Sequence, residues 1–236
     1  MKHSEQDKLI RRYYQYLKLE KNFSANTIDA YMRDLDKFFL FIKDGGKDFL
    51  NVDLPDIHEF SAMMVDVGIS PVSLSRILSG VRSFYHFLVL SDVLEVNPTE
   101  LLEYPKKPKR LPDVLSVDEI DAIESVIDLS LPEGQRNKAI IETLFSCGLR
   151  VSELVNLKIS NMYLDDEFIK VEGKGSKQRL VPISEQAIHE IQLYFLDRNL
   201  IDIAPEYQDY VFVSHRRKKP LTRVMVFIMI KNLVEK

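Results

Sequence analysis

The first ninety residues carry apolar side chains at intervals of three and four positions, which is the period of an amphipathic helix. Capping residues, first-turn prolines and terminal glycines punctuate this pattern and divide it into four stretches. The predicted helices cover residues 4–20, 23–42, 55–67 and 70–90. The pattern therefore predicts a compact four-helix unit over residues 1–92.

The fourth predicted helix has two chemically different faces. Its apolar stripe consists of Leu74, Ile77, Leu78, Val81, Phe84 and Leu88. Its other face combines two arginines with small residues, namely Ser75, Arg76, Ser79, Gly80, Arg82 and Ser83. Small polar residues beside arginines allow a helix to lie close to a DNA backbone. We therefore predict Ser75, Arg76, Ser79 and Arg82 as DNA contacts, with an ordinary solvated face as the alternative.

A proline-rich basic segment, "YPKKPKRLPD", follows the helical part of the chain. Its three prolines are incompatible with a helix interior and favour an extended, semi-rigid linker. We predict a linker over residues 93–112 and a second domain over residues 113–236. The four cations of the segment suit either a solubilising spacer or a strand that follows a phosphate backbone. They are Lys106, Lys107, Lys109 and Arg110.

The second part of the chain mixes helical and β-type patterns. The predicted elements are helices over residues 116–127, 137–147, 151–157 and 185–198, a hairpin over residues 167–183, a strand over residues 210–214 and a last helix from residue 222. The first of these helices begins with Ser116 and has Glu119 three positions later, which is the signature of a capping box. The hairpin contains the glycine-bearing turn of "EFIKVEGKGSKQRLVPI". An α+β domain with a small hairpin sheet follows from this order.

Charge is distributed unevenly along the 236 residues, although the net charge is only −4. Residues 67–91 contain two arginines and no acid, and residues 216–231 contain six cations and no acid. Together with the linker these make three basic blocks, so a polyanionic partner stays compatible with the acidic total.

The chain has one cysteine, Cys147, and neither a signal sequence nor an apolar run of membrane-spanning length. A disulfide framework is therefore excluded, and we expect Cys147 to pack in a core. These features indicate a reducing compartment, and we expect a cytoplasmic protein without a membrane partner.

Two cations stand out by their positions. Arg150, in "GLRVSEL", lies at the joint between two apolar helices. If it is partly buried it needs an anionic partner, and Glu153 is close enough to provide one. Lys174 lies at the predicted hairpin tip between two glycines, which permit tight backbone geometry. A structural ion pair and an ordinary turn lysine remain the alternatives to a functional role.

Taken together, "GLRVSEL" and "GKGSKQRLVPI" resemble the tyrosine recombinase family, particularly its Xer-type members and phage integrases. The resemblance extends to "SANTIDAYMRDLDKF", "SLSRILSGVRSFYHFL" and the basic linker, so it covers essentially the whole chain. It implies a mainly α protein, with an N-terminal four-helix, SAM-like core-binding domain followed by an α+β catalytic domain that has a small β-hairpin sheet.

By this resemblance, Arg150 matches the first catalytic arginine, Glu153 its orienting partner and Lys174 the hairpin lysine. Lys177 and Arg179 fall on the following strand as DNA contacts. In the implied reaction a tyrosine hydroxyl attacks a DNA phosphodiester, leaving a 3′-phosphotyrosyl link and a free 5′-hydroxyl. Arginines would stabilise the phosphate charge and a lysine would protonate the leaving oxygen. One ester replaces another, so neither ATP nor a metal is required.

The resemblance also implies double-stranded recombination sites and further recombinase protomers as partners, with a tetramer on two DNA sites. The chain departs from the family because it shows neither an "HxxR" helix nor a recognisable nucleophilic tyrosine. "HRRK" at His215 has lysine in the arginine position and falls in a turn, so we predict a surface location for it. We therefore expect a C-terminally truncated recombinase that is inactive in strand cleavage alone. The alternative is a non-catalytic DNA-binding or adaptor protein.

Overall fold

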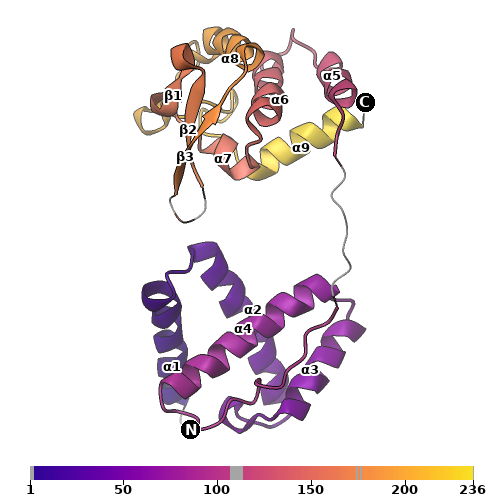
Figure 1. The fold of residues 1–236 in the computed structure, drawn as a ribbon, viewed down its shortest axis with the longest axis vertical. Helices are drawn as coiled ribbons and strands as arrows, with labels where there is room; N and C mark the ends of the chain where they lie inside the picture. The colour runs from indigo at the N-terminus through magenta and orange to yellow at the C-terminus, as the bar shows by residue number, and fades with distance from the viewer. Residues whose placement is uncertain (1–2, 107–113, 174, 176, 236) are drawn as a thin grey trace. The chain divides into compact units, whose positions relative to one another are not determined.

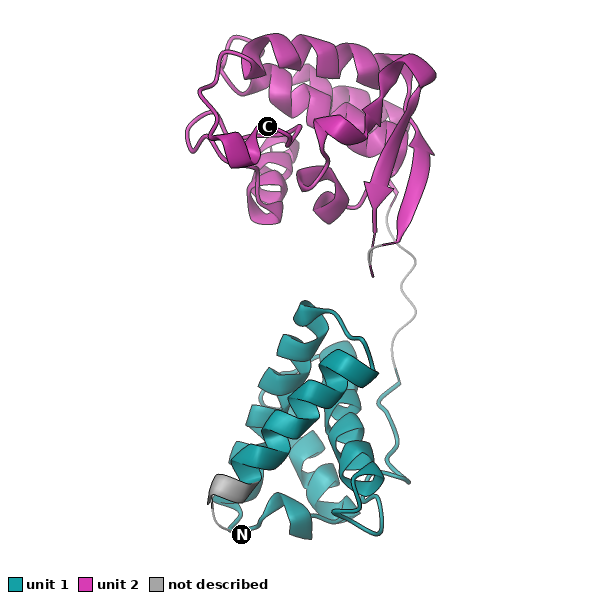
Figure 2. Cartoon of the chain, turned by 90° about the vertical axis from the view of Figure 1, so that its left-hand side faces the viewer, with its two compact units in different colours: residues 1–111 teal, residues 112–236 magenta. Residues whose placement is uncertain are grey.

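The structure is a computed structural model that describes residues 3–106, 114–173, 175 and 177–235. It contains two compact units, residues 1–111 and 112–236 (Figure 2). The division between them falls at the end of the proline-rich basic segment. Each unit has a hydrophobic core of its own, and the two are described separately.

The first unit contains the four helices that the apolar period predicts (Figure 1). They are α1 (His3–Gln15), which a π-helical turn extends over Tyr16–Glu20, α2 (Ala25–Asp44), α3 (Leu54–Asp66) and α4 (Pro71–Leu90). Polar caps fix where three of the helices begin, since Ser24, Asp53 and Ser70 each accept a hydrogen bond from a backbone N–H of the first turn.

Aromatic rings fill the core of this unit. The buried rings of Phe38 and Phe60 meet edge to face with centroids 5.1 Å apart, and Tyr13 and Phe84 do so at 5.2 Å. Leu102 also belongs to this core and is 5% exposed. Val93 and Leu94 pack against the same core, so part of the predicted linker contacts the first unit.

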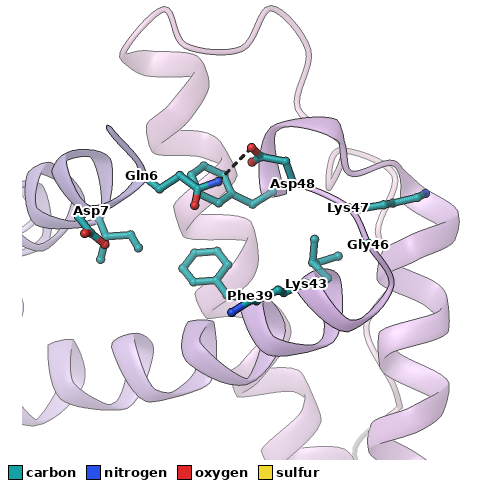
Figure 3. Close-up of a pocket in the computed structure, with 10 residues that line it drawn as sticks. Gln6, Asp7, Phe39, Lys43, Gly46, Lys47 and Asp48 are labelled. Carbon is teal, nitrogen blue, oxygen red and sulfur yellow. Dashed lines mark hydrogen bonds between the residues drawn. The ribbon is translucent and has the colours of Figure 1, made fainter. Parts of the chain in front are cut away.

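A cavity of about 410 Å³ opens between α1, the end of α2 and the 3₁₀ turn Phe49–Asn51 (Figure 3). Phe39 and Phe49 line it, with their ring centroids 5.3 Å apart. Gln6 Nε2 donates a 3.0 Å hydrogen bond to Asp48 Oδ2 and so joins α1 to the turn. The cavity lies wholly within the first unit.

The second unit combines α-helices with a small antiparallel sheet (Figure 1). Its helices are α5 (Val117–Ser125), α6 (Gly134–Cys147), α7 (Val151–Val155), α8 (Glu185–Arg198) and α9 (Arg223–Val234). Its strands are β1 (Met162–Tyr163), β2 (Phe168–Glu172) and β3 (Gln178–Pro182), antiparallel in the order β1-β2-β3. The predicted hairpin is confirmed, with Ile169 opposite Val181 and Glu172 opposite Gln178.

The predicted strand over residues 210–214 was wrong. Tyr210 and Val213 make only isolated bridges, to Lys158 and Pro220 respectively. Val211, Phe212 and Val213 are all buried, so this apolar run is a core segment without a continuous strand partner. A short apolar run of this kind has the same pattern as a buried strand, and only the neighbouring chain distinguishes the two.

The core of the second unit lies between α6, α8 and the sheet, and includes Ala139, Ile140, Ile169 and Ile191. Cys147 belongs to it as expected, and burial raises the pKa of its thiol. Among the residues that the structure describes, no helix combines the length and the apolar character needed to cross a bilayer.

Candidate functional site

The joint between α6 and α7 positions Arg150. Helix α6 ends at Gly148, whose φ of 56° is a left-handed conformation that glycine adopts without a Cβ penalty. Two residues later Arg150 is the N-cap of α7, in an extended conformation. Its backbone N–H donates to Glu153 Oε2 at 2.8 Å, and its Nη1 donates to Glu153 Oε1 at 2.9 Å. One carboxylate therefore fixes both the backbone and the side chain of Arg150.

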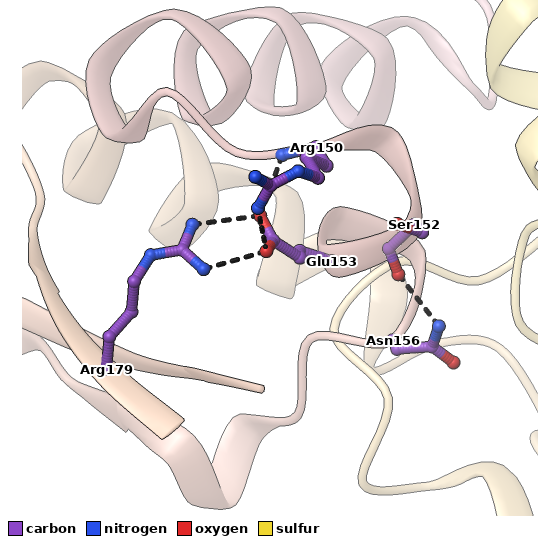
Figure 4. Close-up of polar contacts among 5 residues, drawn as sticks. All are labelled: Arg150, Ser152, Glu153, Asn156 and Arg179. Atoms are coloured by element: carbon purple, nitrogen blue, oxygen red, sulfur yellow. Dashed lines mark hydrogen bonds and ion pairs between the residues drawn. The ribbon is translucent and has the colours of Figure 1, made fainter. Parts of the chain in front are cut away.

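Glu153 is the centre of this arrangement (Figure 4). Its side chain is only 3% exposed, and Arg179 from β3 holds it with two parallel hydrogen bonds of 2.7 and 2.9 Å. These bonds from Arg179 and those from Arg150 lower the pKa of Glu153 to about 2, against burial, which raises it. The carboxylate is therefore ionised at neutral pH, between two guanidinium groups.

The guanidinium of Arg150 itself is 72% exposed. The buried charge of this pair therefore belongs to Glu153 and not to Arg150. Nη1 is the one nitrogen of this guanidinium that hydrogen bonds within the described part of the chain. Its remaining donors face solvent and can bind an anion while Glu153 holds the side chain in place.

The β2–β3 hairpin packs directly against this cluster. A Cβ on Gly173 would lie 3.3 Å from Arg179 Nη1 and 3.4 Å from Glu153 Oε1. The absence of a side chain at Gly173 thus lets the hairpin backbone lie close to Arg179 and Glu153. Gly175, with a φ of 76°, supplies the backbone conformation of the turn. Lys174, the predicted general acid, lies between them and outside the described residues. A cavity of about 320 Å³ opens beside Glu153 and is also lined by Tyr210.

The prediction that Ser75 of α4 contacts DNA was wrong. It is 1% exposed, and its Oγ is buried without a hydrogen-bond partner among the described residues. The neighbouring Gly80 is buried too, with a Cβ position 3.7 Å from the Tyr31 ring and 3.8 Å from the Asp34 side chain. The small residues of α4 therefore allow close packing against α2, and a sequence pattern of small residues does not distinguish a helix neighbour from DNA.

The other three residues of α4 that we predicted to contact DNA reach the surface, but their side chains bind other groups of the protein. Arg76 forms an ion pair with the buried carboxylate of Asp34. Ser79 Oγ donates to the Ser75 carbonyl at 2.7 Å. Arg82 donates to the Glu100 carbonyl at 3.0 Å, and its guanidinium lies 5.7 Å from the ring centroid of Tyr104. Arg82 therefore retains a positive charge that no carboxylate of the described chain balances.

Sequence reasoning missed Asp34. The available signal was its place on the apolar stripe of α2, three residues after Tyr31 and four before Phe38. A carboxylate on a buried face needs a cation, and burial indeed raises the pKa of Asp34 against the opposing effect of Arg76. Of the remaining predicted contacts, Lys106 and Lys177 are exposed. Lys107, Lys109 and Arg110 lie outside the described residues.

Comparison with known proteins agrees with this geometry. Residues 10–91 match the phage integrase N-terminal SAM-like domain, and residues 113–236 match the phage integrase family. The chain therefore belongs to the phage integrase, or tyrosine recombinase, family, as the motifs around Arg150 and Lys174 suggested.

Particular relatives include two Xer proteins. The chain is 35% identical over 227 residues to tyrosine recombinase XerD of Oceanobacillus iheyensis, covering 95% of this chain and 76% of that protein. It is 35% identical over 238 residues to tyrosine recombinase XerC of Bacillus pumilus, covering 99% and 77%.

Solved structures show the same fold. A lambda integrase dimer bound to a COC′ core site has a TM-score of 0.73 at 17% identity, covering 97% of this chain and 62% of that one. XerH bound to difH in a pre-cleavage complex has a TM-score of 0.70 at 20% identity, covering 96% and 66%. A mainly helical fold with an N-terminal SAM-like domain is thereby confirmed.

Proposed function

We propose that this chain provides part of a DNA strand-exchange centre in which Arg150 binds the non-bridging oxygens of the scissile phosphate. The observation that carries the proposal is an exposed guanidinium whose position is fixed by a buried, ionised carboxylate. Lys174 is the general acid for the leaving 5′-oxygen, and the attacking group is a tyrosine hydroxyl that becomes a 3′-phosphotyrosyl ester.

The geometry suits phosphoryl transfer, which depends on positioned charge. An arginine fork binds two phosphate oxygens at once, but a freely rotating side chain would lose entropy on binding. Glu153 removes much of that freedom before DNA arrives. Arg179 in turn holds Glu153, so the two arginines and one carboxylate carry a net charge of about +1 toward the phosphate.

Double-stranded DNA and further protomers are the proposed partners. Two solved structures of one protein with the same fold, lambda integrase, are described with DNA, one as a dimer on a core site and the other as a tetramer on a Holliday junction. For this chain the support is the positive charge of the half-buried Arg82 and of the exposed Lys106, Lys177 and Arg150. Whether it recombines DNA or acts as a non-catalytic adaptor depends on the chemistry at Arg150.

We expect the chain to bind duplex DNA with a steep salt dependence. If ~4 to 6 phosphates are neutralised, log K should fall against log salt with a slope of roughly −4 to −5. Arg82→Ala should flatten that slope by about one unit, because its charge is not balanced by a carboxylate. Fluorescence anisotropy of a labelled duplex, measured between roughly 50 and 300 mM salt, gives the slope.

Arg11→Ala is the matched control, since it removes an exposed arginine of α1 that no proposed contact includes. Its slope should equal that of the unaltered chain. Arg76→Ala is a poorer probe because it also leaves the buried Asp34 without its main partner. Salt-insensitive binding, or equal effects of Arg82→Ala and Arg11→Ala, would contradict the proposed interface.

We also expect residues 1–236 alone to form no covalent DNA adduct. Tyr13, Tyr16, Tyr85 and Tyr194 are buried. None of the ten tyrosine hydroxyls has a hydrogen bond to Arg150, Glu153 or Arg179. A nicked suicide substrate, incubated with the chain and run on a denaturing gel, should therefore yield only free protein.

An adduct would overturn this expectation and would make Tyr210 the first candidate nucleophile, because it lines the cavity beside Glu153. Tyr210→Phe would test that outcome directly. Tyr163→Phe is the control, because Tyr163 does not line that cavity. Its ring stacks on Phe168 with the two centroids 4.7 Å apart.

A further inference from the structure

A half-buried arginine of the second unit, Arg136, forms no ion pair within the described residues, although the charge of Glu133 acts on it at longer range. Arg136 lies in the first turn of α6, and its Nε and Nη2 donate to Asn137 Oδ1 at 3.2 and 2.8 Å. Its Nη1 donates to the Val213 carbonyl at 3.3 Å. These acceptors are neutral, and no ion pair of the described residues includes Arg136. A guanidinium held out of water without an anion is unfavourable, and burial accordingly lowers its pKa.

The open side of Arg136 faces a pocket of about 300 Å³. The turn that follows the core segment supplies three basic side chains to its lining, His215, Arg216 and Arg217. Glu133 is the one acid among the residues that line it. With histidine neutral, three guanidinium groups and one carboxylate give the lining a charge of about +2 at neutral pH.

The turn that carries these side chains is an ordered structure. Ser214 N–H donates to the Lys219 carbonyl at 2.8 Å, and Lys218 N–H donates to the Ser214 carbonyl at 2.8 Å. The Arg217 N–H donates to Ser214 Oγ at 3.1 Å. Arg216 and Arg217 are exposed and take part in no ion pair of the described chain. The backbone of the turn therefore holds both residues beside the pocket, and neither side chain has an ion-pair partner in the described chain.

We propose that this pocket is a phosphate-binding site, and that it takes a backbone phosphodiester of the duplex bound by the second unit. Arg136 uses three of its five N–H donors on Asn137 and Val213, which leaves two for an anion. Arg216 and Arg217 supply further planar forks that match phosphate oxygens. The identity of the phosphate as DNA rests on the proposed function, whereas the anion site itself rests only on these side chains.

This phosphate is distinct from the one at Arg150. Helix α6 has 14 residues, with Arg136 in its first turn and its end three residues before Arg150. At 1.5 Å per residue the two positions are separated by roughly 20 Å along the helix. A single phosphate cannot contact both positions at that separation, so the pocket would hold a phosphate other than the reacting one.

The ε-methyl group of Met225, which lines the pocket, is a reporter for occupancy. In ¹³C-methyl NMR spectra of the chain, inorganic phosphate should shift the Met225 signal, and sodium chloride at matched ionic strength should not. Duplex DNA should shift the same signal. In the double variant Arg216→Ala/Arg217→Ala both responses should be lost, and the slope of log K against log salt should flatten by about two units.

Lys231→Ala is the matched control, because Lys231 belongs to the same basic block but pairs with Glu235 outside the pocket. The variant Arg216→Lys/Arg217→Lys should restore most of the slope, which shows that the alanine variant failed through charge and not through misfolding. A Met225 response to phosphate with an unchanged DNA slope would overturn the DNA assignment and leave a site for free phosphate.

If the double variant matches Lys231→Ala in both measurements, no phosphate site exists in this pocket. If the unaltered chain binds no DNA but its Met225 signal responds to phosphate, the proposed function fails and the anion site stands. The two proposals are therefore tested separately by the same samples.

Discussion

Sulfur substitution at the cleaved bond should restore cleavage to Lys174→Ala and not to Arg150→Ala. The experiment uses a polypeptide in which this chain is joined to a segment carrying the nucleophilic tyrosine. An alkoxide leaving group needs a proton as its bond to phosphorus breaks, and a positioned acid contributes ~10²–10⁴ in rate. A thiolate is stable near neutral pH, so a bridging 5′-sulfur removes that need.

The role proposed for Arg150 concerns different atoms. Negative charge on the non-bridging oxygens develops whichever atom leaves, so losing the exposed guanidinium held by Glu153 should cost about 10²–10³ in rate with either substrate. Single-turnover cleavage rates of each variant on matched oxygen and sulfur substrates measure the loss of rate and its rescue by sulfur. Lys177→Ala is the control, because it removes an exposed cation of the same hairpin without a proposed role in protonation.

Equal rescue of the two variants would remove the distinction between an acid and a charge-stabilising residue. If sulfur rescues neither, Lys174 positions DNA and the acid is another group. If both alanine variants cleave at the unaltered rate, the adaptor alternative holds and the chain contributes binding alone.

The second large effect concerns the stability of the second unit and its dependence on pH. Glu153→Gln should lower the free energy of unfolding by about 2 kcal/mol at pH 7, because the neutral amide pairs poorly with two guanidinium groups. It also cannot accept all three of the hydrogen bonds from those groups together with the one from the Arg150 backbone N–H. The exposure of both arginine partners keeps this figure below the value for a fully buried pair.

The sign of the pH dependence follows from the depressed pKa of Glu153, about 2 in the folded chain against about 4.3 in the unfolded one. Its stabilising contribution is complete above the unfolded value and decreases as pH falls from about 4.3 toward 2. The stability difference between the unaltered chain and Glu153→Gln should therefore shrink over that range.

Urea unfolding followed by circular dichroism at pH 7 and pH 3 measures this difference. Glu172→Gln, which changes an exposed glutamate on β2, is the control. Its free energy of unfolding should match that of the unaltered chain at both pH values. A difference that stays constant between pH 7 and pH 3 would mean that Glu153 is not held as an ion between Arg150 and Arg179.

Local patterns in the sequence determined most of the fold. The four helices of the first unit, the capping box at Ser116 and the hairpin are confirmed, because helical period, caps and glycine turns act over a few residues. The pairing of Arg150 with Glu153 was also within reach, since the two are three positions apart on one helical turn. The resemblance to the family added the chemistry that we propose for these positions.

The tertiary structure alone decided which side chains meet across long stretches of chain. Arg179 reaches Glu153 from 26 residues away, and Arg76 reaches Asp34 from 42. Periodicity assigns a residue to a face of its own element, but it does not say which element covers that face. For the same reason Ser75 proved to be buried against α2, and Arg136 proved to bind the carbonyl of Val213, 77 residues away in sequence and next to the basic turn.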